Sequence, residues 1–209
     1  GEVVSNSEVC GVGGPDVHIY RGGPGSADVT PPVVLGHGYS GEVVGVGQGV
    51  TGFTVGDHVT IDPNIYCGHC QYCQNGKKQL CETMEAIGVT RDGGFAEYSL
   101  IPAAQAFKLD PSVPFESAAM AEPLACCLHG IDLAGIQVGD KVCVVGGGAI
   151  GLLMVQLAKL SGASQIVLSE PNEKRRQVGL QLGANAAIDP TRPDAQENFA
   201  QVLDGGANV

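Results

Sequence analysis

The stretch Lys141-Val-Cys-Val-Val-Gly-Gly-Gly-Ala-Ile-Gly151 decides the fold of the second half of this chain. Its apolar first part is typical of a buried strand, its glycines follow the pattern G-x-G-x-x-G, and a helical pattern continues to Leu160. The first glycine permits a tight turn, the second lets backbone approach a pyrophosphate, and the third lets the helix pack on the strand. The pattern predicts a dinucleotide site at the helix N-terminus, and a glycine-rich connection without a ligand is the alternative. The predicted contacts come from Gly146, Gly148, Ala149, Ile150 and Gly151.

An acidic residue follows the next predicted strand. Glu170 stands about 20 residues beyond Gly151, where such a fold binds the adenosine ribose. A carboxylate there accepts hydrogen bonds from the ribose hydroxyls and repels a 2′-phosphate. Arg175 and Arg176 lie close in sequence and favour the opposite choice, but Glu170 holds the decisive strand end. We therefore predict NAD as the cofactor, with Glu170 and Arg175 among its contacts.

Four cysteines form a second motif, C-x2-C-x2-C-x7-C, at Cys67, Cys70, Cys73 and Cys81. Thiolates at this spacing can converge on Zn²⁺ in a tetrahedron, and four of them leave no open position, so the predicted zinc is structural. Two disulfides or an iron–sulfur cluster are the alternatives. No secretory signal is visible, and ferredoxin spacings differ from this one. His69, inside the motif, is interpreted as a solvated loop residue.

Composition and charge exclude several classes of function. Acidic residues outnumber basic ones 22 to 11, so the chain repels a phosphate backbone, and 5% aromatic residues are few for base stacking. Nucleic acid is therefore not expected as a partner. The most apolar stretch, residues 142–160, contains glycines and a Gln and does not meet the requirement for a membrane span. The N-terminus has no basic region followed by an apolar run, so we expect no signal peptide and a cytoplasmic protein.

The chain changes its hydrophobic period near the middle. Short apolar runs separated by Gly and Pro predict strands over residues 2–4, 33–35, 42–46, 58–61 and 95–101. Helices are then predicted over residues 117–133, 149–160, 172–182 and 195–203, alternating with strands over 141–145, 165–168 and 186–188. This alternation predicts a doubly wound parallel sheet. The chain lacks an initial Met and ends where such a sheet is half built, so we expect a truncated fragment.

The cysteine and glycine motifs, in this order, resemble the zinc-containing medium-chain alcohol dehydrogenase family over the whole chain. The phrases DVHIYRGG, DGGFAEY, MAEPLACCLHG and LSEPNEKRR are most similar to its polyol branch, the sorbitol and 2,3-butanediol dehydrogenases. Threonine dehydrogenases are similar around DVHIY but usually differ at the counterpart of Ala121-Glu122-Pro123.

The resemblance implies a GroES-like catalytic domain over residues 1–125, with the structural zinc lobe near residues 66–82. It also implies an incomplete Rossmann NAD-binding domain over residues 126–209. A catalytic zinc, a small-molecule alcohol or ketone substrate, and a dimer or tetramer of the full-length protein follow from the same resemblance.

The catalytic zinc site of the resembled family is altered here. The family motif C-G-x-C-G-T-D-x-H appears as Cys10-Gly-Val-Gly-Gly-Pro-Asp-Val-His18, so Gly13 stands at the thiolate ligand and Pro15 at the proton-relaying hydroxyl. His18 stands where the family passes the proton to solvent.

Two ligands of that site are retained. The family motif G-H-E appears as Gly36-His37-Gly38, and Ala121-Glu122-Pro123 keeps the polyol branch's carboxylate ligand. His37 and Glu122 are therefore the residual ligands of a catalytic zinc. A shift of the glycine-rich loop would let Cys10 supply the missing thiolate. Otherwise Cys10 is a small buried side chain, His37 a hydrogen-bonded loop histidine and Glu122 a helix-end carboxylate.

Two hypotheses about function remain open. The first is an NAD-dependent zinc dehydrogenase that transfers hydride between a secondary alcohol or polyol and NAD. The second is a non-catalytic, zinc-containing dinucleotide-binding relative or fragment, which Gly13, Pro15 and Gly38 favour. A zinc-free reductase of the same superfamily is disfavoured, because such proteins usually lack the four-cysteine lobe.

Overall fold

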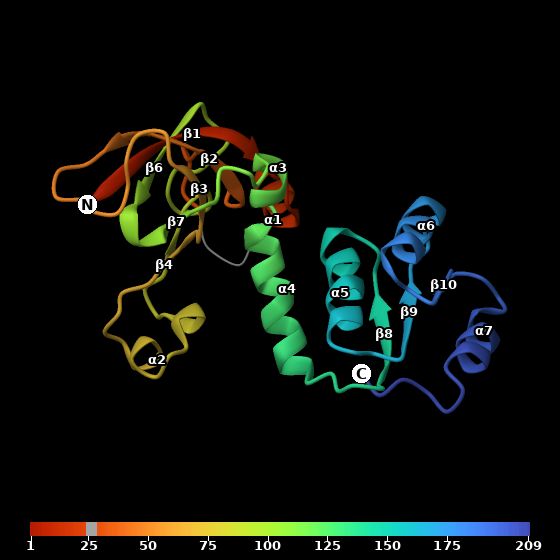
Figure 1. Ribbon diagram of the computed structural model, residues 1–209. Coiled ribbons are helices and arrows are strands. Elements are labelled where there is room, and N and C mark those ends of the chain that lie inside the picture. Colours follow the sequence, from red (N-terminus) through yellow and green to blue (C-terminus); the bar gives the residue numbers. More distant parts are fainter. Residues whose placement is uncertain (24–28) are drawn as a thin grey trace. The chain divides into compact units, whose positions relative to one another are not determined.

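The computed structural model describes residues 1–23 and 29–209, which form two compact units, Gly1–Glu122 and Pro123–Val209 (Figure 1). The first unit is built on an antiparallel sheet and the second on parallel strands alternating with helices. This confirms the predicted combination of a β fold followed by an α/β fold. No helix in the described ranges is long and apolar enough to cross a membrane.

A five-stranded antiparallel sheet of order β6-β1-β2-β3-β7 organises the first unit. Its strands are β1 (Glu2–Cys10), β2 (Tyr39–Val46), β3 (His58–Ile61), β6 (Tyr98–Pro102) and β7 (Ala106–Lys108). Side chains alternate between the two faces of such a sheet, and one face supplies the core. The fully buried members of that core are Val3, Tyr39, Val43, Val59, Ile87 and Ile101.

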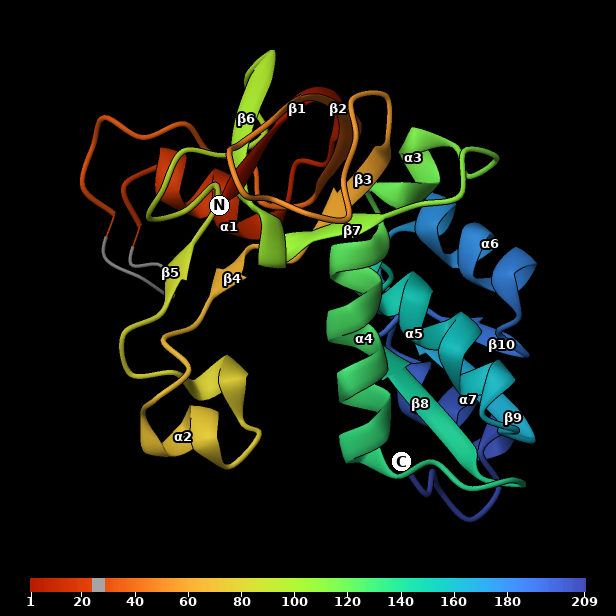
Figure 2. The ribbon, with the colours of Figure 1, turned by 60° about the vertical axis from the view of Figure 1, so that its left-hand side comes forward.

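A lobe extends from this sheet where β4 (Asn64–Ile65) pairs with β5 (Glu85–Ala86) (Figure 2). Between these two strands the chain forms α2 (Gln71–Gln74) and the short 3₁₀ helix η1 (Lys78–Leu80). The unit also contains α1 (Gly14–Tyr20), η2 (Ala103–Gln105) and α3 (Phe115–Ala118). The helix α4 (Ala121–Ala134) begins at its end.

Two predictions of secondary structure are wrong. Residues 33–35 form no strand: the Val34 N–H donates to Asp92 Oδ1 at 2.8 Å, while the Val34 and Leu35 carbonyls accept from the turn at Gly93 and Phe95. Backbone groups that would pair with a neighbouring strand are therefore bonded to Asp92 and to the turn that follows it. The helix predicted over residues 117–133 is two helices, α3 and α4. Pro123 has no N–H to donate to the carbonyl of Ala119, so a continuous helix would lack that bond.

The second unit has a parallel sheet of order β10-β9-β8, with β8 (Lys141–Val145), β9 (Gln165–Ser169) and β10 (Ala186–Ile188). Its helices are α5 (Ala149–Leu160), α6 (Glu173–Leu182) and α7 (Ala195–Val202). Val155 and Ala158 of α5 pack with Leu168 on one face of the sheet, whereas Ala195 of α7 packs with Val167 on the other. Helices on both faces of parallel strands make this unit doubly wound, as the sequence predicts.

Candidate functional site

The glycine turn between β8 and α5 has the geometry of a dinucleotide loop. Gly146 has φ +101°, a backbone conformation that other residues rarely adopt. A Cβ on Gly151 would overlap the carbonyl oxygen of Gly146, so the helix starts in close contact with the turn. Gly148 is the N-cap of α5, and a Cβ there would meet no atom within 4 Å. The N-terminus of α5 is therefore open for an anion to approach.

The Glu170 carboxylate lies against this turn. Its Oε2 atom accepts a hydrogen bond from the Gly147 N–H at 2.6 Å, and its Oε1 atom accepts one from the Asn172 N–H at 2.8 Å. Those two donors, at Asn172 and Gly147, together with the positive charge of Arg175, lower the pKa of the carboxyl. Its side chain is only 5% exposed, so the carboxylate is fixed at the edge of the loop that the sequence assigns to the dinucleotide.

The two arginines that follow Glu170 have different surroundings. Arg175 is 59% exposed, and its guanidinium lies 4.0 Å from Glu170 Oε2. Arg176 instead donates to the carbonyl oxygens of Glu170 and Pro171, both at 2.7 Å, and pairs with Asp189. Arg176 is therefore held by the protein, whereas Arg175 can reach a ligand at this edge.

The four cysteines of the lobe converge. Their sulfur atoms all lie within 4.8 Å of one another, and within the described ranges none of the four is in a disulfide. Gly68 and Gly76 supply left-handed turns, with φ +77° and +75°. The Sγ atom of Cys67 accepts hydrogen bonds from the backbone N–H groups of His69 and Cys70. These hydrogen bonds lower the pKa of Cys67 to about 6. Four sulfur ligands that converge on one point fit a tetrahedral zinc ion, and the N–H groups that donate to Cys67 Sγ stabilise its thiolate.

Other side chains of the lobe support this arrangement without joining it. His69 is exposed, and its Nδ1 lies 2.9 Å from the carbonyl oxygen of Cys67, as expected for a loop residue. Lys78 Nζ donates to Tyr66 Oη at 2.9 Å and lies 4.3 Å from the centre of the Tyr66 ring. This contact joins the residue before Cys67 to the start of η1.

His37 faces a buried aspartate that the sequence analysis did not select. His37 Nδ1 lies 3.4 Å from Asp16 Oδ1, and the Asp16 side chain is 4% exposed. The other oxygen of Asp16 accepts from the Gly13 N–H at 2.7 Å. Within the described residues neither facing atom has a hydrogen-bond partner of good geometry. The Asp of the motif that ends at His18 marks this residue in the sequence, but no local pattern shows that it packs against His37.

The remaining predicted site residues surround this pair without completing a metal site. A Cβ on Gly38 would lie 3.7 Å from Glu122 Oε2, so Glu122 lies beside the position where the resembled family has a second carboxylate. His18 lies exposed on α1. Among the described residues, only the four lobe cysteines bring three or more ligating atoms within 4.8 Å of one another.

Cys10 does not take the thiolate's place. Its side chain packs against the core of the first unit, and its Sγ lies 2.7 Å from where a Cβ on Gly36 would be. Burial, with a smaller contribution from the charge of Asp16, raises the pKa of Cys10 to about 12. A catalytic zinc needs about three protein ligands and one open position. The residues present do not fit such a site.

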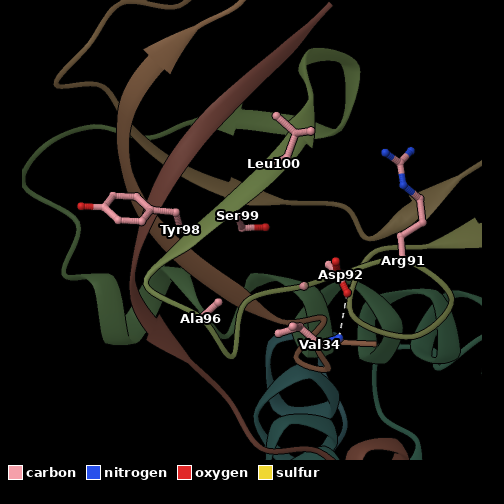
Figure 3. A pocket seen from close by; sticks show the side chains of 8 residues that line it. Val34, Arg91, Asp92, Ala96, Tyr98, Ser99 and Leu100 are labelled. Atoms are coloured by element: carbon pink, nitrogen blue, oxygen red, sulfur yellow. Dashed lines mark hydrogen bonds between the residues drawn. The ribbon is translucent and has the colours of Figure 1, made fainter. Parts of the chain in front are cut away.

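A separate pocket of about 310 Å³ lies beside β6 in the first unit (Figure 3). Asp92 in its wall accepts the Val34 N–H, and Arg91 is paired with Glu2 and Glu85. None of the predicted site residues lines it. The pairing of Asp92 and Arg91 within the first unit accounts for the charged groups of this pocket.

Comparison with known proteins identifies the family. Residues 1–111 match the alcohol dehydrogenase GroES-like domain, and residues 149–209 match the zinc-binding dehydrogenase family. The chain therefore belongs to the zinc-binding, medium-chain alcohol dehydrogenase family, with a GroES-like part followed by a Rossmann-type sheet.

Individual relatives agree with this assignment. The L-threonine 3-dehydrogenase of Bacillus licheniformis is 40% identical over 100% of this chain and 60% of its own length. A Sinorhizobium meliloti structure described as a zinc-binding dehydrogenase bound to NADP is 45% identical with TM-score 0.89, covering 94% of this chain and 56% of its own. The structure of galactitol-1-phosphate dehydrogenase of Escherichia coli is 30% identical with TM-score 0.85, covering 97% of this chain and 58% of its own. The chain spans about three fifths of the length of these relatives.

Proposed function

We propose that this protein is an oxidoreductase that transfers hydride between a secondary alcohol or polyol and NAD(H). The observation that carries the proposal is the 2.6 Å bond between Gly147 N–H and Glu170, which holds a carboxylate against an open helix N-terminus. That pairing suits the two ends of an ADP group, since the helix start attracts the pyrophosphate and the carboxylate accepts the ribose hydroxyls.

Each unit has its own part in this function. We infer that residues 126–209 bind the dinucleotide and residues 1–125 form the catalytic domain, a boundary supported by the division between Glu122 and Pro123. Gly146, Gly148, Ala149, Ile150 and Gly151 hold the pyrophosphate, and Glu170 and Arg175 orient the adenosine ribose. The dinucleotide, when bound, supplies the nicotinamide carbon that accepts hydride from the alcohol.

We further propose that Cys67, Cys70, Cys73 and Cys81 hold a structural zinc ion. The lobe has only the two-residue pair of β4 and β5 and two very short helices as regular structure. Because so little apolar surface is available there, bound metal supplies the free energy that orders the lobe.

The substrate class is inferred from the carboxylate at Glu122 and from relatives. Ala121-Glu122-Pro123 favours a polyol, and the similarity to galactitol-1-phosphate dehydrogenase supports that choice. The similarity to L-threonine 3-dehydrogenase supports L-threonine as the competing substrate. In a polyol and in L-threonine alike, the carbon that carries the secondary hydroxyl is bonded to a carbon that carries an oxygen or a nitrogen. NADP is the competing cofactor, because the Sinorhizobium protein binds it.

A dinucleotide-binding protein without alcohol turnover is the second candidate function. Gly13 and Gly38 supply no metal ligand, and Pro15 has no hydroxyl for a proton relay. A homo-oligomer and a cytoplasmic location remain predictions for either candidate.

One experiment separates the candidates. NADH and NADPH are each titrated into the purified chain and followed by their fluorescence. Formation of the reduced cofactor is then measured with sorbitol, 2,3-butanediol, galactitol 1-phosphate and L-threonine. Binding with turnover of a polyol supports the proposal, and turnover of L-threonine alone selects the competing substrate. Binding without any turnover selects the second candidate. A chain that binds neither NADH nor NADPH contradicts both.

A further inference from the structure

Gly13 lies where a side chain would reach the imidazole of His37. A Cβ built on Gly13 falls 3.4 Å from His37 Cε1 and 3.3 Å from Asp16 Oδ2. These contacts are tight but do not overlap, so the neighbours need to move by only a few tenths of an ångström. A Cβ on the next residue, Gly14, would meet nothing within 4 Å. Two adjacent glycines therefore differ sharply in what a new side chain would contact.

The imidazole beside Gly13 is still held in the manner of a metal ligand. Asp16 is buried, and its Oδ2 is fixed by the Gly13 N–H while its Oδ1 faces His37 Nδ1. Proteins that use a histidine as a metal ligand commonly place a carboxylate or carbonyl at the other ring nitrogen, which sets the ring's orientation. The His37 side chain is 16% exposed, although its Nδ1 atom is fully covered. The exposed part of the ring thus lies away from Asp16.

A third protein donor is missing. Gly13 and Gly38 have no side chains, and Cys10 packs against the core beside Gly36. Zinc held by fewer than three protein ligands stays largely hydrated and is easily lost. The support for a ligating histidine is therefore present without a complete set of ligands.

We propose that this chain holds one transition metal, at the four lobe cysteines, and none at His37. Asp16 is a positioning residue, and Gly13 is the position at which a single substitution to Cys completes a second site. The proposal rests on the zinc lobe of the proposed function, but not on dinucleotide binding or turnover, so the two can fail separately.

The test is metal content by elemental analysis after dialysis with a non-thiol reductant. The unmutated chain should retain one zinc, Gly13→Cys two, and the matched control Gly14→Cys one. Gly13→Cys combined with His37→Ala should return to one. Replacing Zn²⁺ by Co²⁺ gives a second readout, because an added cobalt–thiolate bond adds charge-transfer absorption in Gly13→Cys but not in Gly14→Cys. Adding Asp16→Asn to Gly13→Cys should weaken the second metal by about 10- to 100-fold.

Four results would overturn the proposal. Two tightly held zincs in the unmutated chain would mean that another group completes the site, and this measurement needs no variant to fold. One zinc in a folded Gly13→Cys chain would show that position 13 is not a ligand position. A second zinc in Gly14→Cys, or one that survives His37→Ala, would show that the metal does not bind through His37.

Discussion

The Glu170 carboxylate occupies the space that a side chain on residue 147 would need. A Cβ on Gly147 would lie 2.9 Å from Glu170 Cγ and 3.0 Å from Glu170 Oε2, while the Gly147 N–H donates to that same oxygen at 2.6 Å. Residue 147 stands at a variable position of the G-x-G-x-x-G pattern. Here the Glu170 carboxylate, directly after β9, leaves space for glycine alone at that position.

Replacing Gly147 by Ala should therefore destabilise the second unit. Overpacking of this kind costs about 1–3 kcal/mol. Gly148→Ala is the matched control, because its Cβ meets nothing within 4 Å and its φ of −73° suits alanine. Chemical denaturation of both variants gives the comparison. Because the clash is with Glu170, the penalty of Gly147→Ala should shrink in a Glu170→Ala background. An equal penalty in both backgrounds would contradict the clash.

Replacing Glu170 by Ser should narrow the preference for NAD(H) over NADP(H). The carboxylate repels a 2′-phosphate, and Arg175 beside it can bind that phosphate once the carboxylate is gone. We expect the dissociation constant for NADPH divided by that for NADH to fall by about tenfold, which corresponds to about 1.4 kcal/mol. Fluorescence titration with both reduced cofactors measures the ratio, and Glu173→Ser, an exposed residue of α6, is the control. Equal or tighter NADPH binding by the unmutated chain would refute the assignment.

Acid should weaken the second unit through Glu170. Its pKa is lowered in the folded chain by the N–H groups of Asn172 and Gly147. A group whose pKa is lower when folded stabilises the protein above its unfolded pKa, and that stabilisation is lost as the pH falls through the folded value. Melting temperatures between about pH 6 and pH 3 should therefore fall less steeply for Glu170→Gln than for the control Glu197→Gln. Parallel curves would mean that folding does not lower the pKa of this carboxyl.

Removing one lobe thiolate should unfold the lobe. We expect Cys70→Ser to lose the retained zinc and to lower the melting temperature, since zinc contributes about 10 kcal/mol to folding in small zinc peptides. Amide exchange should accelerate between Tyr66 and Glu82 and stay slow in β1 and β2. Cys126→Ser, an exposed cysteine of α4, is the control. An unchanged melting temperature and zinc content would contradict a structural metal at these cysteines.

The parallel unit could be predicted closely because its signals are local. The change from period 2 to period 3.6 marks each strand and helix, and the glycine turn joins two of them directly. The antiparallel unit was harder. Residues 33–35 look like a strand, but their bonds go to Asp92 and its neighbours, 58 residues away from Val34. The sequence does not predict helix α1, because Gly13-Gly14-Pro15 is typical of a turn, although proline also suits a first helical turn.

The residues of the candidate site also differ in whether the sequence predicts their partners. The cysteine spacing and the place of Glu170 after its strand point to their partners from sequence alone, because each partner lies within a few residues or at a fixed offset. Asp16 matters through His37, which comes from a different part of the chain. No local pattern reports that a carboxylate is buried against a distant imidazole.

The short span of the lobe has a consequence for how the protein is made. All four cysteines have left the ribosome once Cys81 has emerged, before β6, the neighbour of β1, has left it. Closing such short loops costs less entropy than pairing strands across the whole unit. A newly made chain can therefore capture its metal while the sheet is still incomplete.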